Sequence, residues 1–589
     1  MTNTSIKLDD KFNLLKSNVL LNGTQGLVRL MLGQKQRDEK LGLNTAGFVT
    51  GYRGSPLGAV DFQMRRASKE LAASNIQFKE ALNEDLAATA LWGSQQAELR
   101  GEGLYDGVFG LWYGKGPGVD RSGDAMRHAN MAGSSLNGGV LMAMGDDHTG
   151  ESSTVLHQSD LAMIDAGMPI LSPAGVQEIL DYGYYGFALS RYSGLWVGLK
   201  TMKDTIEVTS VVDGDPLRMK FKVPKTRSGT DHLNIRLVDT PADQEKRLFN
   251  DKKAAAEEFA RANKIDKIVL PNLKSKIGLV AAGKNWLDLI HALSLLGINE
   301  NEAKALGITS YKIVQTWPID RKSLLEWADQ LDVIIVVEEK RKIVETQIKD
   351  ALFSISSKTR VYGGHKNDDK LFFDHGVLDP LDIAAALGQI FKEEGCSNNS
   401  LELSMKKIRQ VQSADNAPDL AERLPYFCAG CPHNSSTVVP DGSRAYAGIG
   451  CHYMAQWMDR ETLGFTHMGG EGANWIGESL FSKREHVFQN IGDGTYNHSG
   501  IQAIRAAVAA NTDITYKILF NDAVAMTGGQ GNDGQLSAIR VVNELLAIGI
   551  KNTVLVYDDK EDLSLTSFPP AVEKAVSYTH LTLPTNREV

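Results

Sequence analysis

Two polar motifs follow apolar segments in the last third of the chain. Gly492-Asp493-Gly494 ends one apolar run, and Asn521 ends the next, at 514–520, after an intervening helical pattern. In a βαβ unit these positions lie at the carboxyl ends of adjacent parallel strands, where such sheets bind ligands. The carboxylate of Asp493, the side-chain oxygen of Asn521 and the carbonyl of Ala523 are the hard oxygen ligands that Mg²⁺ prefers. The glycines let backbone N–H groups approach the phosphates of a bound diphosphate.

The separation of 27 positions between Gly494 and Asn521 resembles the motif that binds thiamine diphosphate through Mg²⁺. The alternative is a tight strand-to-helix turn followed by an unrelated asparagine. Thiamine diphosphate also requires a carboxylate beside N1′ of its aminopyrimidine ring. Glu84, which opens a helix of small residues, is the best candidate in the sequence, although a glutamate at a helix start is also favoured by the helix dipole alone.

A second group of residues suited to chemistry is a set of cysteines. Cys428 and Cys431 form a CxxC motif followed by Pro432, and Cys451 lies 20 positions after Cys431. Three thiolates suit a [4Fe-4S] cluster, with a zinc site or a redox pair as alternatives. Cys396 lies in a polar segment that gives it no rigid placement, so we expect the fourth ligand beyond residue 575.

The overall composition narrows the class of protein. A net charge of −9 over 589 residues argues against a nucleic-acid or membrane-surface partner. No apolar run approaches the ~20 residues of a membrane span, and the N-terminus has no signal-peptide core. Four cysteines without a disulfide pattern indicate a reduced compartment, so we expect a cytoplasmic protein. Residues 576–589 resemble a non-native tail, and we expect the natural chain to continue past this point.

The elements that position these residues follow an α/β pattern. Short apolar strands alternate with helices from about residue 45 to 199, again from 276 to 337, and a third time from 424 onward. Such alternation predicts several doubly wound parallel sheets. Residues 223–270 are highly charged, and 241–264 is expected to form a solvated helix in a connection between domains.

These patterns mark six segments, and the resemblance to thiamine diphosphate enzymes implies the identity of the three α/β domains among them. They are a pyrimidine-binding domain (1–222), a charged linker (223–270), a transketolase C-terminal-like domain (271–362), a second linker (363–424), a thiamine diphosphate and Mg²⁺ domain with the cysteine cluster (425–575), and the non-native tail (576–589).

Seven motifs together resemble the 2-oxoacid:ferredoxin oxidoreductase family, and most closely its indolepyruvate branch, over about residues 20–570. They are GYRGSP (51–56), NED (83–85), GDDHTGESS (145–153), FCAGCPH (427–433), GIGC (448–451), GDGTYNHSG (492–500) and NDAVAMTGGQ (521–530). Two departures are clear. Arg53 stands where relatives often carry proline, and the chain holds no ferredoxin-like CxxCxxCxxxCP segment.

The resemblance implies a role for each matching position. It places Glu84 on N1′, Ser55 near the substrate, and His433 near the thiamine. Residues implied to bind cofactor or metal are Gly492, Asp493, Gly494 and Asn497 at the diphosphate, Asn521 and Ala523 with Asp493 at Mg²⁺, Thr527 and Gly528 at the thiazolium, and Cys428, Cys431 and Cys451 at the iron–sulfur cluster. Lys115 or Arg121 is a weaker candidate for the substrate carboxylate.

The implied reaction is oxidative decarboxylation of an aryl 2-oxo acid resembling indolepyruvate, with coenzyme A as acyl acceptor and ferredoxin as electron acceptor. A homodimer is implied, together with an acyl-transfer domain or subunit absent from this chain. Two alternatives stay open. One is a non-oxidative thiamine diphosphate-dependent decarboxylase or synthase, which would not need the cysteines, and the other is an inactive fragment that only binds the cofactor.

Overall fold

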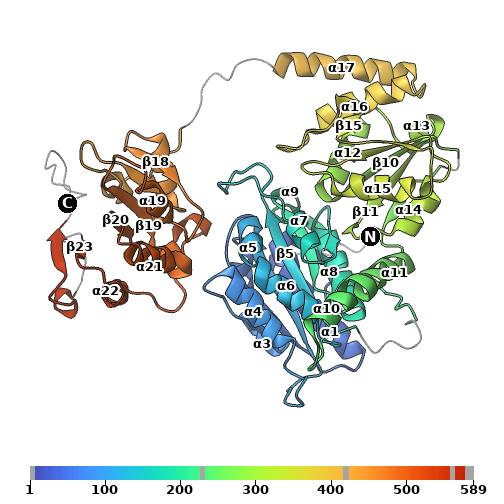
Figure 1. Cartoon of the computed structure of the whole chain (residues 1–589). Coiled ribbons are helices and arrows are strands. Elements are labelled where there is room, and N and C mark those ends of the chain that lie inside the picture. Colours follow the sequence, from blue (N-terminus) through green and yellow to red (C-terminus); the bar gives the residue numbers. More distant parts are fainter. Residues whose placement is uncertain (1–6, 226–232, 273, 416–423, 558–563, 577–589) are drawn as a thin grey trace. The chain divides into compact units, whose positions relative to one another are not determined.

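A computed structural model describes residues 7–225, 233–272, 274–415, 424–557 and 564–576 (Figure 1). The tail from 577 onward therefore lies outside the described residues. The chain divides into two compact units, residues 1–418 and 419–589, and each is described by itself.

The first unit is built on a sheet of seven strands. Their order is β12 (Gln315–Trp317), β6 (Ile170–Leu171), β7 (Val197–Met202), β5 (Val140–Asp146), β4 (Val108–Lys115), β2 (Ala46–Gly51) and β3 (Ile76–Phe78). All neighbours are parallel except β12, which pairs antiparallel with β6. Because the strands are parallel, the residues that follow β2, β3, β4 and β5 meet at one edge of the sheet.

Both faces of this sheet are covered, as its apolar strands require. One face packs against α1 (Gly23–Lys40), α2 (Val60–Arg66) and α8 (Val176–Ser193), with Leu111 and Leu141 pointing into that core. The other packs against α4 (Glu84–Ser94) and α6 (Gly123–Ala132), with Trp112 and Met142 pointing the opposite way. The two helix layers are visible around β5 in Figure 1.

A second sheet of five strands completes the first unit. Its order is β14 (Arg360–Tyr362), β13 (Val333–Val337), β10 (Ile277–Ala282), β11 (Ile308–Ile313) and β9 (Lys267–Leu270), with only β9 antiparallel to its neighbour. Alternate residues of β13 enter two separate cores. Helix α12 (Gly283–Leu295) covers one face, and α14 (Arg321–Ala328) with α15 (Ile343–Phe353) covers the other.

Two segments expected to be linkers pack more closely than predicted. Residues 241–264 form α10 (Pro241–Lys246), a π-helical turn (Arg247–Lys252) and α11 (Lys253–Asn263), and Leu248 and Phe259 are buried in the first core. The expectation of a solvated helix was therefore wrong. In 363–424, α16 (Pro380–Glu393) packs on α12 and buries Phe391 in the second core. Its apolar stripe makes this helix part of the second sheet's domain.

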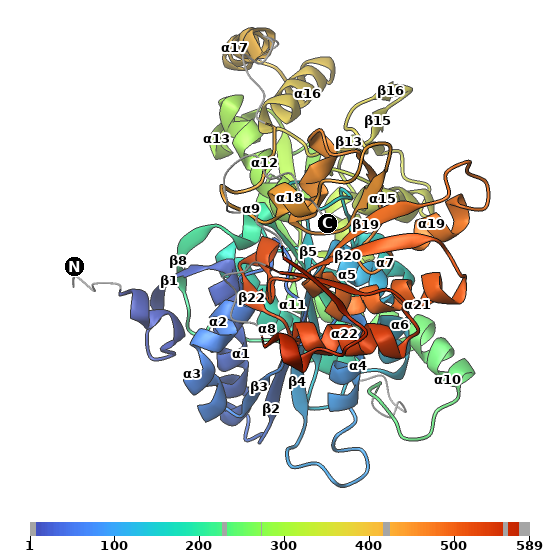
Figure 2. The same ribbon diagram turned by 90° about the vertical axis from the view of Figure 1, so that its left-hand side faces the viewer.

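The second unit contains a parallel sheet of four strands, in the order β18 (Thr462–Phe465), β17 (Ala445–Ala447), β19 (Val487–Gly492) and β20 (Ile514–Leu519). Figure 2, a view rotated by 90° from that of Figure 1, shows its β19, β20 and α21 (Ile501–Ala509) facing the viewer. The predicted α/β class with several parallel sheets is confirmed. Among the described residues, no helix has both the length and the apolar character to cross a membrane.

Candidate cofactor site

The polar motifs of the second unit meet at the carboxyl edge of its sheet. Cys451 lies just after β17, Glu471 follows β18, Asp493 directly follows β19, and Asn521 lies two residues after β20. Strands β19 and β20 are parallel neighbours with Gly492 opposite Leu519. The predicted βαβ placement of Asp493 and Asn521 therefore agrees with the structure.

Asp493 is almost fully buried, with 2% of its surface exposed. One carboxylate oxygen accepts the N–H of Gly494 at 2.9 Å, and the other accepts the N–H of Asn521 at 3.2 Å and the Nδ2 of Asn532 at 2.8 Å. Burial raises the pKa of this carboxyl against the lowering effect of these donors. Asn532 was not predicted from the sequence, where nothing except its position after the TGGQ run (527–530) indicates a role.

The chain reverses direction just after Asn521. Asp522 adopts a left-handed conformation with φ of 54°, and β21 (Ala523–Val524) then pairs antiparallel with β22 (Gln530–Gly531). The side-chain oxygen of Asn521 accepts the N–H of Ala523 at 3.1 Å. A Cβ at Gly494 would lie 3.2 Å from a methyl of Val524, so the 492–494 turn and this hairpin pack closely together.

The remaining predicted residues of this motif lie on the same turn and hairpin, held by local bonds. Asn497 donates from Nδ2 to the Asp533 carbonyl at 2.9 Å, and the Thr527 hydroxyl donates to Oε1 of Gln530 at 2.9 Å. Gly528 has a φ of 129°, which favours glycine. The predicted contacts of these residues with a cofactor remain predictions.

Two buried ionisable residues near the turn were not predicted. Glu471 is fully buried and accepts the N–H groups of Ile449 at 3.2 Å and Gly469 at 2.7 Å, and burial raises its pKa to about 7. His452 accepts the N–H of Gly448 on Nδ1, while its buried Nε2 has no partner among the described residues. Burial, with a contribution from His433, lowers the pKa of His452 to about 3. The sequence feature that could have pointed to both residues is their position beside the glycines of GIGCH (448–452) and GGEG (469–472).

The three clustered cysteines interact electrostatically. The N–H of Cys431 donates to the Cys428 carbonyl at 3.0 Å, so the CxxC forms a tight turn with Gly430 at a φ of 74°. Burial raises the pKa of the Cys451 thiol, and Cys431 and Cys428 raise it further. Within the described ranges, no three His, Cys, Asp or Glu side chains are arranged as a metal site. The thiols supply three soft ligands of the type an iron–sulfur cluster uses, and the cluster itself remains a prediction.

His433 opens the short helix α18 (His433–Ser436) after the CxxC turn. Its ring packs edge-on against Phe427 with centroids 5.4 Å apart and lies 6.1 Å from the ring of His452. Burial lowers its pKa.

The other predicted catalytic residues lie in the first unit, at the carboxyl edge of the seven-stranded sheet. Glu84 begins α4, capped by Asn83, whose side chain accepts the N–H of Leu86 at 3.1 Å. The Glu84 side chain is buried against Gly118, where an added Cβ would lie 2.6 Å from Oε1. Its backbone carbonyl accepts the indole N–H of Trp112 at 3.1 Å. Glu84 is therefore a buried carboxyl held by close packing, and its contact with a cofactor remains a prediction.

Lys115 links Glu84 to the loop that carries Ser55. Lys115 ends β4, and an added Cβ on Gly54 would lie 2.7 Å from its side chain, so Ser55 lies one residue from this contact. Burial lowers the pKa of Lys115, while Asp147 and Glu84 raise it. Its Nζ donates to the Ser152 carbonyl at 2.8 Å. Arg121, the other candidate, is instead 3.4 Å from Asp85.

The loop 145–160 fixes this edge of the sheet. The carboxylate of Asp147 accepts the N–H groups of Gly150, Glu151 and Ser152. Nε2 of His157 donates to Oδ2 of Asp120 at 2.7 Å, and its Nδ1 lies 3.6 Å from Oδ1 of the fully buried Asp146. The loop therefore contacts Lys115 through Ser152 and helix α5 (Gly116–Arg121) through the pair of His157 and Asp120.

The donor set after β19 and β20 fits a magnesium ion. Asp493, Asn521 and the Ala523 carbonyl would all offer oxygen ligands, and Oδ1 of Asp493, which accepts one bond, has a second lone pair for an ion, whereas Oδ2 already accepts two bonds. A buried carboxyl whose pKa is raised by desolvation is also one that a cation would stabilise in its charged form.

Comparison with known proteins is consistent with this geometry. Residues 267–415 match the model of the indolepyruvate oxidoreductase domain, and residues 448–576 match that of the C-terminal TPP-binding domain of thiamine pyrophosphate enzymes. The first match extends through α16, in agreement with its packing on the second sheet.

Individual relatives cover most of the chain. The indolepyruvate oxidoreductase subunit IorA of Pyrococcus horikoshii is 23% identical over 539 residues, which is 88% of this chain and 76% of that protein. The IorA subunit of Methanothermobacter marburgensis is 22% identical over 502 residues, 83% of this chain and 74% of that protein. A solved 2-oxoglutarate:ferredoxin oxidoreductase from Magnetococcus marinus aligns at 15% identity with a TM-score of 0.46, covering 64% of this chain and 66% of that one. By its two matched domains and its curated relatives, the chain is similar over most of its length to the IorA subunits of indolepyruvate oxidoreductase.

Proposed function

We propose that this chain is the thiamine diphosphate-binding subunit of an enzyme that oxidatively decarboxylates an aryl 2-oxo acid resembling indolepyruvate. The acyl group passes to coenzyme A, and the electrons pass through a [4Fe-4S] cluster to ferredoxin. The observation that carries the proposal is the pair of Asp493 and Asn521 at the ends of adjacent parallel strands, with the glycine turn 492–494 at the same edge of the sheet.

In this proposal each residue acts through the chemistry that its surroundings permit. Asp493, Asn521 and the Ala523 carbonyl hold Mg²⁺, and the turn at 492–494 presents N–H groups to the phosphates. Bound thiamine diphosphate supplies an electron sink for the carbon next to the carboxylate. Glu84, buried and packed on Gly118, holds a proton at N1′ of the aminopyrimidine.

The substrate end is formed by Lys115 and the 51–56 loop. A partly desolvated lysine ammonium pairs strongly with a carboxylate, because the low local dielectric strengthens their attraction. Lys115 has this character, since burial lowers its pKa while two acids oppose that effect. Lys115 therefore binds the 2-oxo acid carboxylate, and Ser55 contacts the neighbouring carbonyl.

The proposal includes partners. The relatives are named as subunits, and we expect a second subunit to provide acyl transfer, with two copies of this chain forming the active assembly. Cys428, Cys431 and Cys451 supply three ligands of the cluster, and the fourth comes from outside the described residues. We place the enzyme in the cytoplasm, where thiols stay reduced.

The test compares Glu84→Gln with the wild type. Glutamine keeps the shape but cannot hold the proton, so release of CO₂ from indolepyruvate should fall about 100-fold or more. Binding of Mg²⁺ and thiamine diphosphate, followed by tryptophan fluorescence, should change far less. Glu70→Gln, at an exposed position on α3 (Ser68–Ala73), is the matched control and should retain full activity.

Three outcomes are decisive. Unchanged CO₂ release in Glu84→Gln would remove Glu84 from the reaction. The non-oxidative alternative would be identified if the protein released CO₂ but did not reduce a viologen dye when coenzyme A was added. The same preparation would contain no iron or sulfide. Failure of the wild type to bind the cofactor in the presence of Mg²⁺ would overturn the proposal as a whole.

A further inference from the structure

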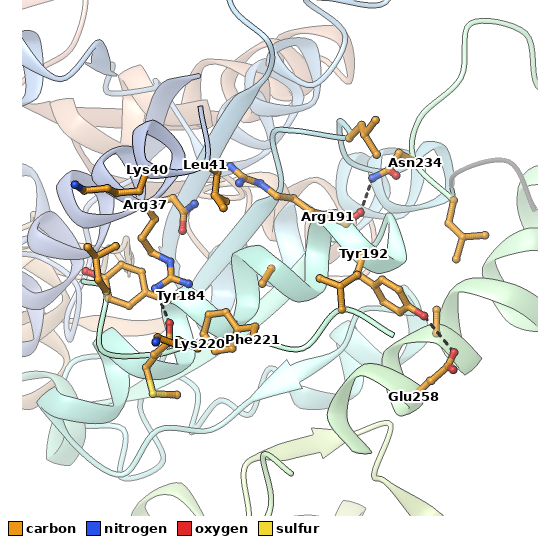
Figure 3. A pocket seen from close by; sticks show the side chains of 18 of the residues that line it. Arg37, Lys40, Leu41, Tyr184, Arg191, Tyr192, Lys220, Phe221, Asn234 and Glu258 are labelled. Atoms are coloured by element: carbon orange, nitrogen blue, oxygen red, sulfur yellow. Dashed lines mark hydrogen bonds between the residues drawn. The ribbon is translucent and has the colours of Figure 1, made fainter. Parts of the chain in front are cut away.

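The first unit contains a cavity of about 760 Å³ at the edge of the seven-stranded sheet opposite to Glu84. Helix α1 runs into β2 and helix α8 runs into β7, so the last turns of both helices lie beside the amino ends of these strands. Those last turns form one wall. The segment 217–223, residues 251–258 and, from other parts of the chain, Leu136, Leu233 and Asn234 form the rest (Figure 3). Its volume is typical of small-molecule sites.

The walls are mainly apolar and aromatic. The residues of this kind are Leu41, Leu136, Tyr184, Ala188, Tyr192, Leu217, Met219, Phe221, Val223, Leu233, Ala254 and Ala255. Tyr184 is fixed in the first core with 3% of its surface exposed. The walls thus form a rigid surface for an apolar body, provided by elements distant in the sequence.

Arg37 is held rigidly at one end of the cavity. Its guanidinium lies over the ring of Tyr184 at 5.3 Å and over that of Phe221 at 5.0 Å. Nη1 donates to the carbonyls of Pro216 at 2.6 Å and Met219 at 2.8 Å. Among the described residues, no acceptor bonds to Nε or Nη2. The nitrogens Nε and Nη2 of a fixed, partly desolvated cation therefore remain as donors for a ligand, and burial lowers the pKa of Arg37.

Positive charge gathers at this end. Lys40 and Lys220 line the cavity near Arg37, as Figure 3 shows, and neither forms an ion pair with a described residue. Arg191 does not add to this charge, because both its terminal nitrogens pair with Asp38 at 2.6 and 2.8 Å. The far end is different in character, with Tyr192 donating to Glu258 at 3.2 Å. The cavity is therefore polarised along its length.

We propose that this cavity is a binding site for an amphipathic organic acid, with its carboxylate against Arg37, Lys40 and Lys220 and its apolar body between Tyr184, Tyr192 and Phe221. The site lies at the amino edge of the sheet, whereas Glu84 and Lys115 lie at the carboxyl edge. It is thus separate from the proposed reaction. Residues 226–232 lie outside the described residues, and the proposal uses none of them.

The experiment uses the whole chain and the fluorescent anion 8-anilinonaphthalene-1-sulfonate as the probe. Decanoate should displace the probe from the site, and decanol, which lacks the charge, should do so at least tenfold less well. The double variant Lys40→Glu/Lys220→Glu should bind decanoate at least tenfold more weakly. Ala188→Trp, which fills the cavity from α8, should abolish the displaceable signal.

Lys69→Glu/Lys358→Glu is the matched control, because both lysines are exposed and neither lines the cavity. It should bind decanoate like the wild type. Equal affinity for decanoate and decanol, or unchanged binding in Lys40→Glu/Lys220→Glu, would overturn the proposal. If Ala188→Trp has lost its unfolding transition and is therefore misfolded, the proposal is judged on the binding of decanoate by Lys40→Glu/Lys220→Glu alone.

Discussion

At the scale of single residues, Asp493 combines two properties that normally conflict. It is buried, which raises its pKa, yet it accepts three hydrogen bonds, which favour its charged form. A divalent ion at the same carboxylate would resolve this balance in favour of the charge. The side chain is thus better placed to bind a cation than to stabilise the fold by itself.

We predict that Asp493→Asn weakens Mg²⁺-dependent binding of thiamine diphosphate about 100-fold, since it removes a charged ligand from the ion while keeping the size of the side chain. Isothermal titration calorimetry with and without Mg²⁺ measures the effect. Asp459→Asn, at an exposed position in the same unit, should bind like the wild type. Equal affinity in Asp493→Asn and wild type would show that the ion, if bound, lies elsewhere.

The surroundings of His157 predict that the stability of the first unit depends on pH. Burial alone would lower its pKa, but its bonds to Asp120 and Asp146 outweigh burial and raise the pKa to about 9. The unfolded chain has a histidine pKa near 6.5, so the folded state binds the proton more tightly. The resulting stability is complete below about pH 6.5 and is lost as pH rises through 9, with a total on the order of 3 kcal/mol.

Chemical unfolding of the first unit between pH 6 and 10 tests this dependence. The wild type should lose stability across that range more steeply than His157→Gln, which cannot carry the charge. His128, an exposed histidine on α6, provides the control, and His128→Gln should keep the wild-type slope. Parallel slopes for wild type and His157→Gln would show that His157 is uncharged in the fold.

At the scale of elements, the strand ends could be predicted because each combines an apolar run with glycine and a polar residue, as at Gly492 and Asp493. Their meeting at one edge follows from parallel pairing. The buried faces of α11 and α16 could not be predicted as readily, because the charged residues around Phe259 and Phe391 mask a narrow apolar stripe. His452 and Glu471 were missed because their burial depends on loops from separate strands.

Residues 312–316 show a second limit. No turn signal interrupts this stretch in the sequence, whereas the structure has β11 ending at Ile313 and β12 beginning at Gln315, each in a different sheet. Both pieces are apolar and buried, so periodicity alone does not mark the change of sheet. The buried Gln315, which accepts from Tyr185 at 3.2 Å and donates to the Pro318 carbonyl at 2.7 Å, fixes the crossing.

Close packing of helix α1 gives the next prediction. A Cβ on Gly23, the first residue of α1, would lie 2.5 Å from the carbonyl oxygen of Ile206 in α9 (Lys203–Ile206) and 2.7 Å from its Cα. Backbone atoms cannot move aside as a side chain can, so Gly23→Ala should destabilise the first unit by about 1–3 kcal/mol. Gly93→Ala in α4, where nothing lies within 4 Å, should instead stabilise it by up to about 1 kcal/mol. Urea unfolding separates the two, and a similar effect of both would contradict the packing.

At the scale of the whole molecule, the two compact units predict two unfolding transitions in calorimetry. Gly23→Ala should lower only the transition of the first unit. Val487→Ala, which opens a gap beside Tyr446 and Trp475, should lower only that of the second by about 1–3 kcal/mol. A single transition that both variants shift alike would show that the units unfold as one.

The same calorimetry tests where the cofactor binds. A ligand that binds only the folded state stabilises it by about 2.7 kcal/mol at 100 times its Kd. Thiamine diphosphate with Mg²⁺ should therefore raise the transition of the unit that holds Asp493 and Asn521, and Asp493→Asn should abolish the shift. If Glu84 also binds the aminopyrimidine, the transition of the first unit should rise as well, and Glu84→Gln should remove that second shift alone. A rise of the second unit's transition only, unchanged by Glu84→Gln, would show that the glutamate does not bind the cofactor.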